Sequence, residues 1–205
     1  MQRFLIIGLW WLSSVFLSGC VSTSKMKWMD GFTNCPAIYR PAVTDANYRA
    51  QIDFGKRHFS GLVLFKIIDE KCHVFFLTET GMKFFDFEYG NGNIKTAYIL
   101  PALDKRPIVN LLQRSFEPLV VSPIENQKRQ EIRTEKAVSF LFPEFKPARR
   151  YTAIEKCEKL TEIVESGKRS YFLSYGNSTA PQHISFHQKQ FHLQFDLSRM
   201  EDATP

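Results

Sequence analysis

The stretch FSGLVLFKIIDEKCHVFFLTETGMKFFDFEYGNGNIKTAYIL, from Phe59 to Leu100, decides the fold of this chain. Its apolar runs are rich in Phe, Val, Ile and Tyr. Three short polar breaks separate them: Asp69-Glu70-Lys71, Thr80-Gly81 and Gly90-Asn91-Gly92-Asn93. This pattern predicts four consecutive antiparallel strands joined by hairpins. A sheet this rich in Phe must lay one face against a core, a lipid or a partner.

The run from Met82 to Tyr89 shows which face is wet. Residues of one parity are Phe85, Phe87 and Tyr89, and those of the other are Phe84, Asp86 and Glu88. Because side chains alternate along a strand, we expect the carboxylates to face solvent. Asp86 and Glu88 share a face, as paired catalytic carboxylates would. Acids are also the ordinary content of the wet face of an antiparallel sheet, and we favour that interpretation.

A helix is predicted directly after these strands. Asp104 is a good N-cap, Pro107 is tolerated in a first turn, and Pro118 is expected to end the helix. The apolar positions recur at intervals of three and four: Ile108, Leu111, Leu112 and Phe116. A helix with one apolar stripe would cover the apolar face of the sheet.

Strands are also predicted on both sides of this unit. Before it, residues 48–54 alternate as a half-buried strand that ends at Gly55. After it, residues 122–136 are polar enough for an exposed loop or a loose helix. Residues 137–142, 149–154, 170–175, 184–186 and 191–197 are predicted strands. Residues 153–164 fit either a helical stripe, which the pattern alone slightly favours, or an alternating strand, which the neighbouring strands favour, so that choice stays open.

The first twenty residues have the form of a secretory signal peptide. Arg3 supplies the positive end, residues 4–16 are apolar, and Leu17-Ser18-Gly19-Cys20 follows. This run resembles the bacterial lipobox, which implies cleavage before Cys20 and a diacylglycerol on its thiol. Two or more acyl chains anchor a protein firmly to a membrane. We therefore predict a signal peptide over 1–19, a lipidated tether over 20–47 and one domain over 48–205.

Composition is consistent with one domain that has a substantial core. The chain has 205 residues, is 44% hydrophobic and carries a formal net charge of +6. Its basic residues are interleaved with acidic ones, whereas a nucleic-acid reader would concentrate them on one face. We therefore expect no nucleic-acid partner.

The thiols and imidazoles offer few candidate sites. Besides Cys20, the chain has Cys35, Cys72 and Cys157, so one pair could form a disulfide, and the sequence allows three pairings. The histidines His183, His187 and His192 lie at turns or on a polar face, which argues against a metal site. The serines sit in no nucleophile elbow. We expect no cofactor, no metal and no enzyme activity.

The chain resembles the LolA and LolB lipoprotein-carrier superfamily, and most of all the small uncharacterised bacterial outer-membrane lipoproteins of that architecture. The residues that carry the likeness are Phe59–Lys66, Leu77–Phe87 and His183–His187, within residues 48–197. The resemblance implies an α+β, mainly β fold: a curved antiparallel sheet or incomplete barrel covered by one or more helices. It also implies an apolar cavity for acyl chains, and sorting to the outer membrane with the domain in the periplasm.

These inferences together predict a lipid-anchored periplasmic binding module that holds an acyl chain or a lipidated partner, with a role in lipoprotein or lipid localisation. Phe rings suit such a cavity because they offer apolar area without polar atoms. The predicted lining residues are Phe65, Phe75, Phe85, Phe87, Leu111, Leu112 and Phe116. The alternative is an accessory or structural envelope lipoprotein that binds a protein partner and has no ligand cavity.

Overall fold

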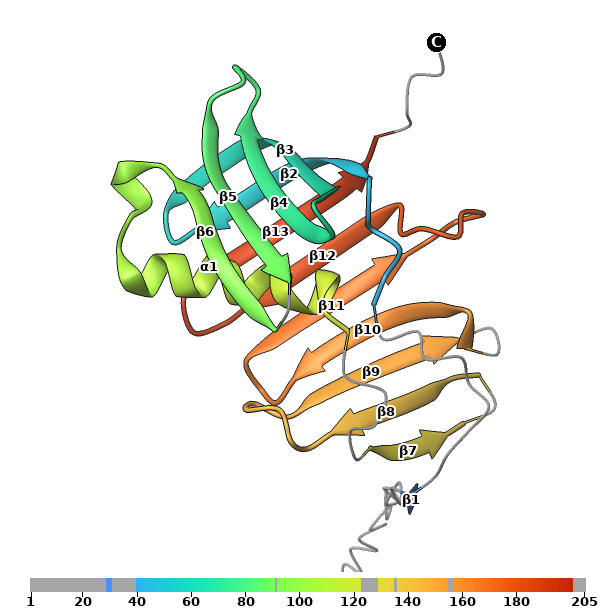
Figure 1. Ribbon diagram of the computed structural model, residues 1–205. Helices are drawn as coiled ribbons and strands as arrows, with labels where there is room; N and C mark the ends of the chain where they lie inside the picture. The colour runs from blue at the N-terminus through green and yellow to red at the C-terminus, as the bar shows by residue number, and fades with distance from the viewer. Residues whose placement is uncertain are drawn as a thin grey trace, which may run out of the picture.

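The computed structural model describes residues 29–30, 40–90, 92–122, 129–134, 136–154 and 157–200. The predicted signal peptide, Cys20 and Cys35 lie outside these residues. The described part is mainly β: one curved, unclosed antiparallel sheet and one α-helix (Figure 1). The strands are β1 (Met29–Asp30), β2 (Asn47–Phe54), β3 (Arg57–Ile68), β4 (Lys71–Thr78), β5 (Lys83–Gly90), β6 (Asn93–Ile99), β7 (Gln130–Arg133), β8 (Val138–Phe142), β9 (Arg149–Ile154), β10 (Lys159–Glu165), β11 (Arg169–Ser174), β12 (His183–Gln188) and β13 (Leu193–Arg199).

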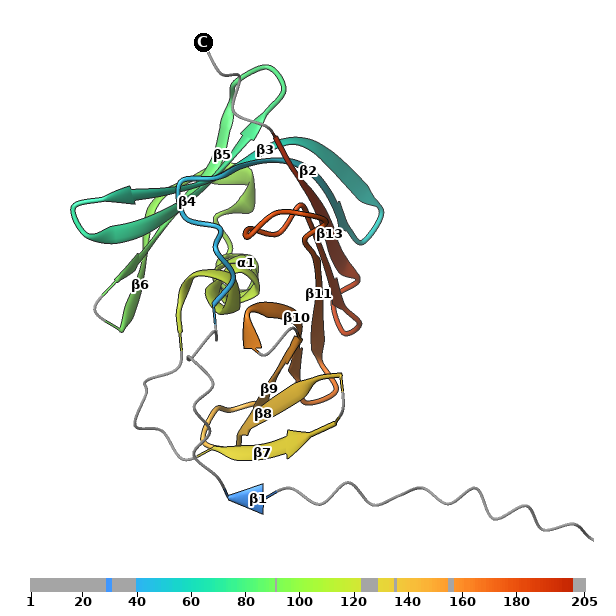
Figure 2. The same ribbon diagram turned by 90° about the vertical axis from the view of Figure 1, so that its right-hand side faces the viewer.

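The sheet consists of two meanders that meet in its middle. Strands β2 to β6 run in chain order to one edge, and β7 to β13 run in chain order from the other, where β1 pairs with β7. The two series join where β13 pairs with β2, from Leu193 opposite Phe54 to Arg199 opposite Tyr48. The helix α1 (Arg106–Val120) lies between β6 and β7 in the chain, so it connects the two outer parts of the sheet. In Figure 2 the sheet curls around this helix.

The four strands predicted over Phe59–Leu100 are present as β3 to β6. The β3–β4 turn holds Asp69 and Glu70 at positive φ, 49° and 63°, which matches the twist of a tight hairpin. Gly61 allows β3 and β4 to approach closely, because a Cβ there would clash with the Leu77 carbonyl oxygen. The sequence therefore requires glycine at this position for steric reasons.

The helix differs from the prediction at both ends. Asp104 is not its N-cap: residues Pro101–Leu103 form a 3₁₀ turn, and Lys105 occupies the cap position without a side-chain cap hydrogen bond. Pro118 does not end the helix, which continues to Val120. Pro118 has no amide hydrogen to give to the Arg114 carbonyl, four residues earlier. Arg169 on β11 donates to that oxygen instead, at 3.2 Å.

The second half of the chain contains more strand than the pattern predicts. Within the polar segment 122–136, expected to be a loop or loose helix, Gln130–Arg133 forms β7 and pairs with β8. The ambiguous segment 153–164 is strand at both ends, because β9 ends at Ile154 and β10 begins at Lys159. The predicted strands 137–142, 170–175, 184–186 and 191–197 correspond to β8, β11, β12 and β13.

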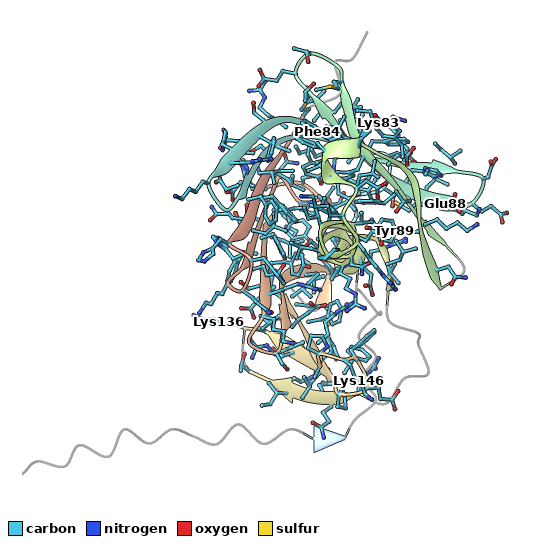
Figure 3. All side chains as sticks on the ribbon, turned by 90° about the vertical axis from the view of Figure 1, so that its left-hand side faces the viewer. Lys83, Phe84, Glu88, Tyr89, Lys136 and Lys146 are labelled. Atoms are coloured by element: carbon cyan, nitrogen blue, oxygen red, sulfur yellow. The ribbon has the colours of Figure 1, made fainter. Side chains whose placement is uncertain are left out.

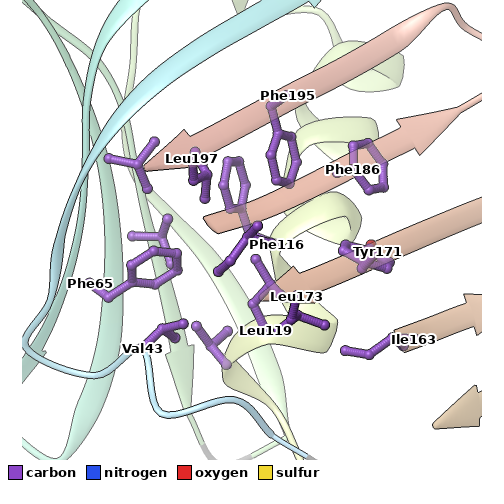
Figure 4. Packing of buried hydrophobic residues seen from close by; sticks show 14 of the residues in the cluster. Val43, Phe65, Phe116, Leu119, Ile163, Tyr171, Leu173, Phe186, Phe195 and Leu197 are labelled. Carbon is purple, nitrogen blue, oxygen red and sulfur yellow. The ribbon is translucent and has the colours of Figure 1, made fainter. Parts of the chain in front are cut away.

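The core lies between α1 and the concave face of the sheet. Phe116 is fully buried and stacks on Phe195 of β13 with ring centroids 4.9 Å apart. Its ring also meets those of Phe65 and Phe85, at 6.5 and 5.6 Å. Figure 4 shows Phe116 and Leu119 between Phe65 on one side and Phe186 and Phe195 on the other. One helix thus links the cores of both meanders.

Candidate functional site

An apolar pocket lies between the N-terminal half of α1 and the sheet. Strands β2 to β5 and β13 supply most of its wall, and the 3₁₀ turn and α1 supply the rest. Its lining residues are Ile52, Phe54, Phe59, Phe76, Phe84, Phe85, Leu103, Ile108, Leu111, Leu112 and Leu193. The pocket volume is about 30 Å³, which is room for a group no larger than one or two water molecules. All lining side chains are hydrocarbon, so the site can bind apolar groups and has no side-chain hydrogen bond to offer.

The structure brings three of the predicted lining residues into this pocket: Phe85, Leu111 and Leu112. Phe65, Phe87 and Phe116 are instead fully buried in the packed core beside it. Phe85 lies at the border between the two groups, because its ring stacks on Phe87 at 4.6 Å and also meets Phe116 at 5.6 Å. The pocket is therefore continuous with the core at Phe85.

Phe75 does not join the other predicted residues, because it lies on the opposite face of β4. Its ring stacks on His73 at 5.6 Å, and the Nζ atom of Lys83 lies 5.2 Å from the ring centroid. Phe76 points to the core and lines the pocket instead. His73 could have separated Phe75 from Phe76, because it lies two residues before Phe75 and therefore on the same face of β4. A polar residue marks the outer face of a half-buried strand.

Phe84 is a pocket residue that the alternation assigned to the wet face. The β4–β5 pairing passes from Phe76 opposite Phe85 to Leu77 opposite Lys83, so Phe84 is the extra residue of a β-bulge. The bulge lets Phe84 pack on Phe59 and Phe76, at 5.5 and 5.3 Å between ring centroids. Figure 3 shows Lys83 and Phe84 near the start of β5.

Side-chain hydrogen bonds hold the C-terminal half of α1 to the sheet. The Tyr89 hydroxyl donates to the Gln113 carbonyl at 2.7 Å, and the Tyr171 hydroxyl donates to the Ser115 carbonyl at 3.1 Å. With the Arg169 bond to Arg114, three successive helix carbonyls accept from β5 and β11. Within the described residues, the side-chain bonds between helix and sheet all reach residues 113–120. The N-terminal half contacts the sheet through apolar side chains.

An ionic cluster reinforces the same end of the helix. The Glu165 carboxylate accepts from Arg149 and from Arg169, each at 2.7 Å, and Glu117 of α1 lies 3.4 Å from Arg149. Burial by itself lowers the pKa of the Arg149 guanidinium. Tyr151 and Glu165 raise this pKa by more than burial lowers it, so the net shift is upward. Arg149 therefore stays charged, and removing Glu165 would take from Arg149 and Arg169 the carboxylate that they share.

The residues considered for catalysis or metal binding do not form a shared centre. Asp86 is buried and lies 2.9 Å from His73 Nδ1, whereas Glu88 pairs with Lys71 at 2.7 Å. On β12, His183 lies opposite Ser198 and His187 opposite Gln194. In the described ranges no three His, Cys, Asp or Glu side chains gather closely enough to hold a metal ion.

The thiols of Cys72 and Cys157 have different states. Cys157 is disulfide-bonded, whereas Cys72 is a free and buried thiol. Burial raises the pKa of the Cys72 thiol to about 11, which keeps it protonated at neutral pH. Cys72 therefore behaves as a small hydrophobic residue.

Comparison with known proteins adds no family to this description: no protein-family model and no curated protein matches the chain. Over the described ranges, no helix is both long enough and apolar enough to cross a bilayer.

Proposed function

We propose that this protein is a lipid-anchored binding module of the bacterial envelope that holds an acyl chain, or the acyl part of a lipidated partner, between α1 and the sheet. The observation that carries the proposal is the pocket lined only by hydrocarbon side chains under the N-terminal half of α1. An apolar site without hydrogen-bonding groups favours a ligand that has none to satisfy. The likeness of the sequence to lipoprotein carriers supports the same ligand class and the fold of an incomplete barrel closed by a helix.

Acyl binding requires this pocket to enlarge. Pockets for small-molecule ligands measure roughly 300–1,000 Å³, about ten times or more the present volume. The N-terminal half of α1 is the part that can move, since its apolar contacts with the sheet have no directional bonds to break. Its first turn also has no acidic residue to stabilise the helix start. We propose that Ile108, Leu111 and Leu112 swing away from Phe84 and Phe85 to admit the chain.

Anchoring is proposed to come from Cys20 and its lipid, with the domain in the periplasm and the lipid in the outer membrane. Ile67 and Ile68, 45% and 43% exposed at the end of β3, offer an apolar contact with the bilayer near the β3–β4 turn. Replacing Cys20 with Ala should leave an unprocessed precursor and abolish labelling by a palmitate analogue. If Cys20→Ala is still processed and labelled, the anchor is elsewhere.

The acyl site is tested by binding of a fluorescent fatty acid to a chain that begins at residue 21, which keeps every described element. We expect saturable binding, and loss of at least about tenfold in affinity for Ile108→Trp, whose indole would fill the pocket that Ile108 lines. Asn110→Trp is the matched control because Asn110 is exposed on the same helix. Absence of saturable binding, or equal loss in both variants, would overturn the proposal.

The small pocket volume also favours a second function, that of an accessory envelope lipoprotein that binds a protein partner. In that case the interior stays filled and the partner uses the outer surface. The β6 edge is mostly exposed and would suit strand addition. Cross-linking from β6 in intact cells, combined with failure of the fatty-acid assay, would select this second function.

A further inference from the structure

A second, larger cavity lies at the opposite end of α1 from the apolar pocket. Its volume is about 570 Å³, and its wall comes from both meanders of the sheet and from the end of the helix. Figure 3 labels two residues that border it, Tyr89 on β5 and Lys146 in the turn after β8. No step of the proposed acyl binding uses this cavity.

The cavity wall is rich in basic side chains. The basic residues are Arg40, Arg114, Lys146, Arg149 and Arg169, and the acidic ones are Glu70, Glu117 and Glu165, which leaves a net of two positive charges. Two of the arginines are neutralised, because Arg149 and Arg169 share the carboxylate of Glu165 and Glu117 lies beside Arg149. The positive and negative charges on the buried floor of the cavity therefore cancel.

The excess charge sits at the rim. Arg40, Arg114 and Lys146 are exposed and form no ion pair with the residues that the structure describes. Arg40 uses one nitrogen to donate to the Val120 carbonyl at 3.2 Å, which fixes it beside the end of the helix. Glu70 is the remaining acid at the rim. An anion that entered would meet three basic groups without displacing an existing carboxylate.

The volume of the cavity and the other residues of its wall indicate which kind of anion would fit. Guanidinium groups bind phosphate oxygens in a planar fork, which makes arginine a preferred phosphate ligand. A bare phosphate would leave most of this volume empty. The cavity also has apolar walls, including Ile94, Val121 and Phe145, that could contact carbon atoms. The site is thus suited to a phosphate attached to a small organic group.

We propose that this cavity binds a phosphate ester through Arg40, Arg114 and Lys146. Two sources carry this chemistry: the headgroup of an anionic phospholipid and a soluble phosphate ester. The site is independent of the acyl pocket, since the Phe65–Phe116 contact and the packed core lie between the two ends of the helix.

The test uses the chain from residue 21 in two arms. Glycerol 3-phosphate is titrated by calorimetry, and sedimentation is measured with vesicles of phosphatidylcholine alone or mixed with phosphatidylglycerol. We expect the double variant Arg114→Gln, Lys146→Gln to lose at least about tenfold in affinity. The matched control is Lys56→Gln, Lys189→Gln, which removes the same charge at exposed positions that do not line the cavity.

The outcomes show whether the cavity binds a phosphate ester and whether that ester is a lipid headgroup or a soluble molecule. Selective loss in the glycerol 3-phosphate arm identifies a soluble ester, and selective loss only with phosphatidylglycerol vesicles identifies a lipid headgroup. Equal loss in both double variants would show general attraction to a basic surface and would overturn the site. Absence of binding in both arms would also overturn it. Fatty-acid binding in the cavity variants is expected to be unchanged, so this site and the acyl pocket fail or succeed separately.

Discussion

Arg169 donates a hydrogen bond to the main-chain oxygen of Arg114, the carbonyl that Pro118 leaves without its helical partner. The same guanidinium pairs with buried Glu165. We expect Arg169→Met to lower the free energy of unfolding by about 1.5–3 kcal/mol, because it removes a charge-assisted bond to Glu165, which stays paired with Arg149, and the bond to the Arg114 carbonyl. Urea unfolding of the two proteins measures the difference.

A double-mutant cycle separates the carbonyl bond from the ion pair. In a Pro118→Ala background the helix can supply its own donor to the Arg114 oxygen. Arg169→Met should then cost about 0.5–1.5 kcal/mol less than it does with Pro118 present. Equal costs in both backgrounds would mean that the bond to Arg114 contributes nothing measurable.

Phe75 and Phe76 are adjacent in the chain but should respond very differently to truncation. Phe76 is 3% exposed and lines the apolar pocket, so Phe76→Ala should cost about 3–5 kcal/mol. Phe75 lies on the outer face beside His73, and Phe75→Ala should cost less than about 1 kcal/mol. Denaturant unfolding of both variants checks the face assignment. A larger loss for Phe75 would contradict the β4 register.

Gly61 should tolerate no side chain. Alanine there would place its Cβ against the Leu77 carbonyl oxygen, so we expect Gly61→Ala to cost about 2–3 kcal/mol. Ser60→Ala, one residue earlier on β3, is the control and should change stability by less than about 0.5 kcal/mol. Thermal unfolding of the pair is sufficient to compare them.

Stability should fall at high pH because several tyrosines are buried. Burial raises the pKa of Tyr48 to about 12 from the ordinary 10.0, and that of Tyr151 to the same value. Below pH 10 both the folded and unfolded chains keep these protons, so stability does not depend on them. Between about pH 10 and about pH 12 these tyrosines ionise in the unfolded chain but stay protonated in the folded one. Stability is therefore lost as pH rises through this window.

Urea unfolding at about pH 9 and about pH 11 measures this loss. Replacing Tyr48 and Tyr151 with Phe should reduce the drop between the two conditions. The substitution removes the Tyr48 bond to the Pro181 carbonyl, so the variant is compared with itself across pH. An unchanged drop would assign the pH dependence to other groups.

The disulfide gives a prediction about the part of the chain that the structure does not describe. Cys157 is bonded and Cys72 is free, which excludes two of the three pairings that the sequence allows. With Cys20 predicted to carry lipid, Cys35 is the expected partner of Cys157. Peptide mapping without reductant should find these two cysteines linked and Cys72 open to alkylation after unfolding. A linked peptide containing Cys72 would contradict the assignment.

The strands could be predicted from the sequence because local alternation and turn residues are sufficient for them. Asp69 and Glu70 marked the β3–β4 hairpin, and Gly55 marked the end of β2. The pairing of β13 with β2 could not be predicted in the same way, since it joins segments from the two ends of the domain. Nor could β7, whose polar residues gain their strand conformation by pairing with β8.

The sequence predicted the pocket residues that follow from local periodicity and missed those that depend on strand register. Leu111 and Leu112 followed from the helical stripe, and Phe85 from strict alternation on β5. Phe84 reaches the pocket only through a bulge, and a bulge depends on the register of the partner strand. Phe75 was placed on the wrong side because two neighbouring Phe residues both satisfy an apolar criterion. The ionic cluster around Glu165 unites residues from α1, β9, β10 and β11, and no local motif marks it.

The last strand in the described sheet fills its centre. Until β13 has been synthesised, β2 and β12 each present an open backbone edge, and the two meanders share no strand pair. Such edges attract other strands, so the nascent chain exposes two edges open to aggregation until β13 appears. The order of synthesis therefore leaves the joining of the two meanders dependent on β13.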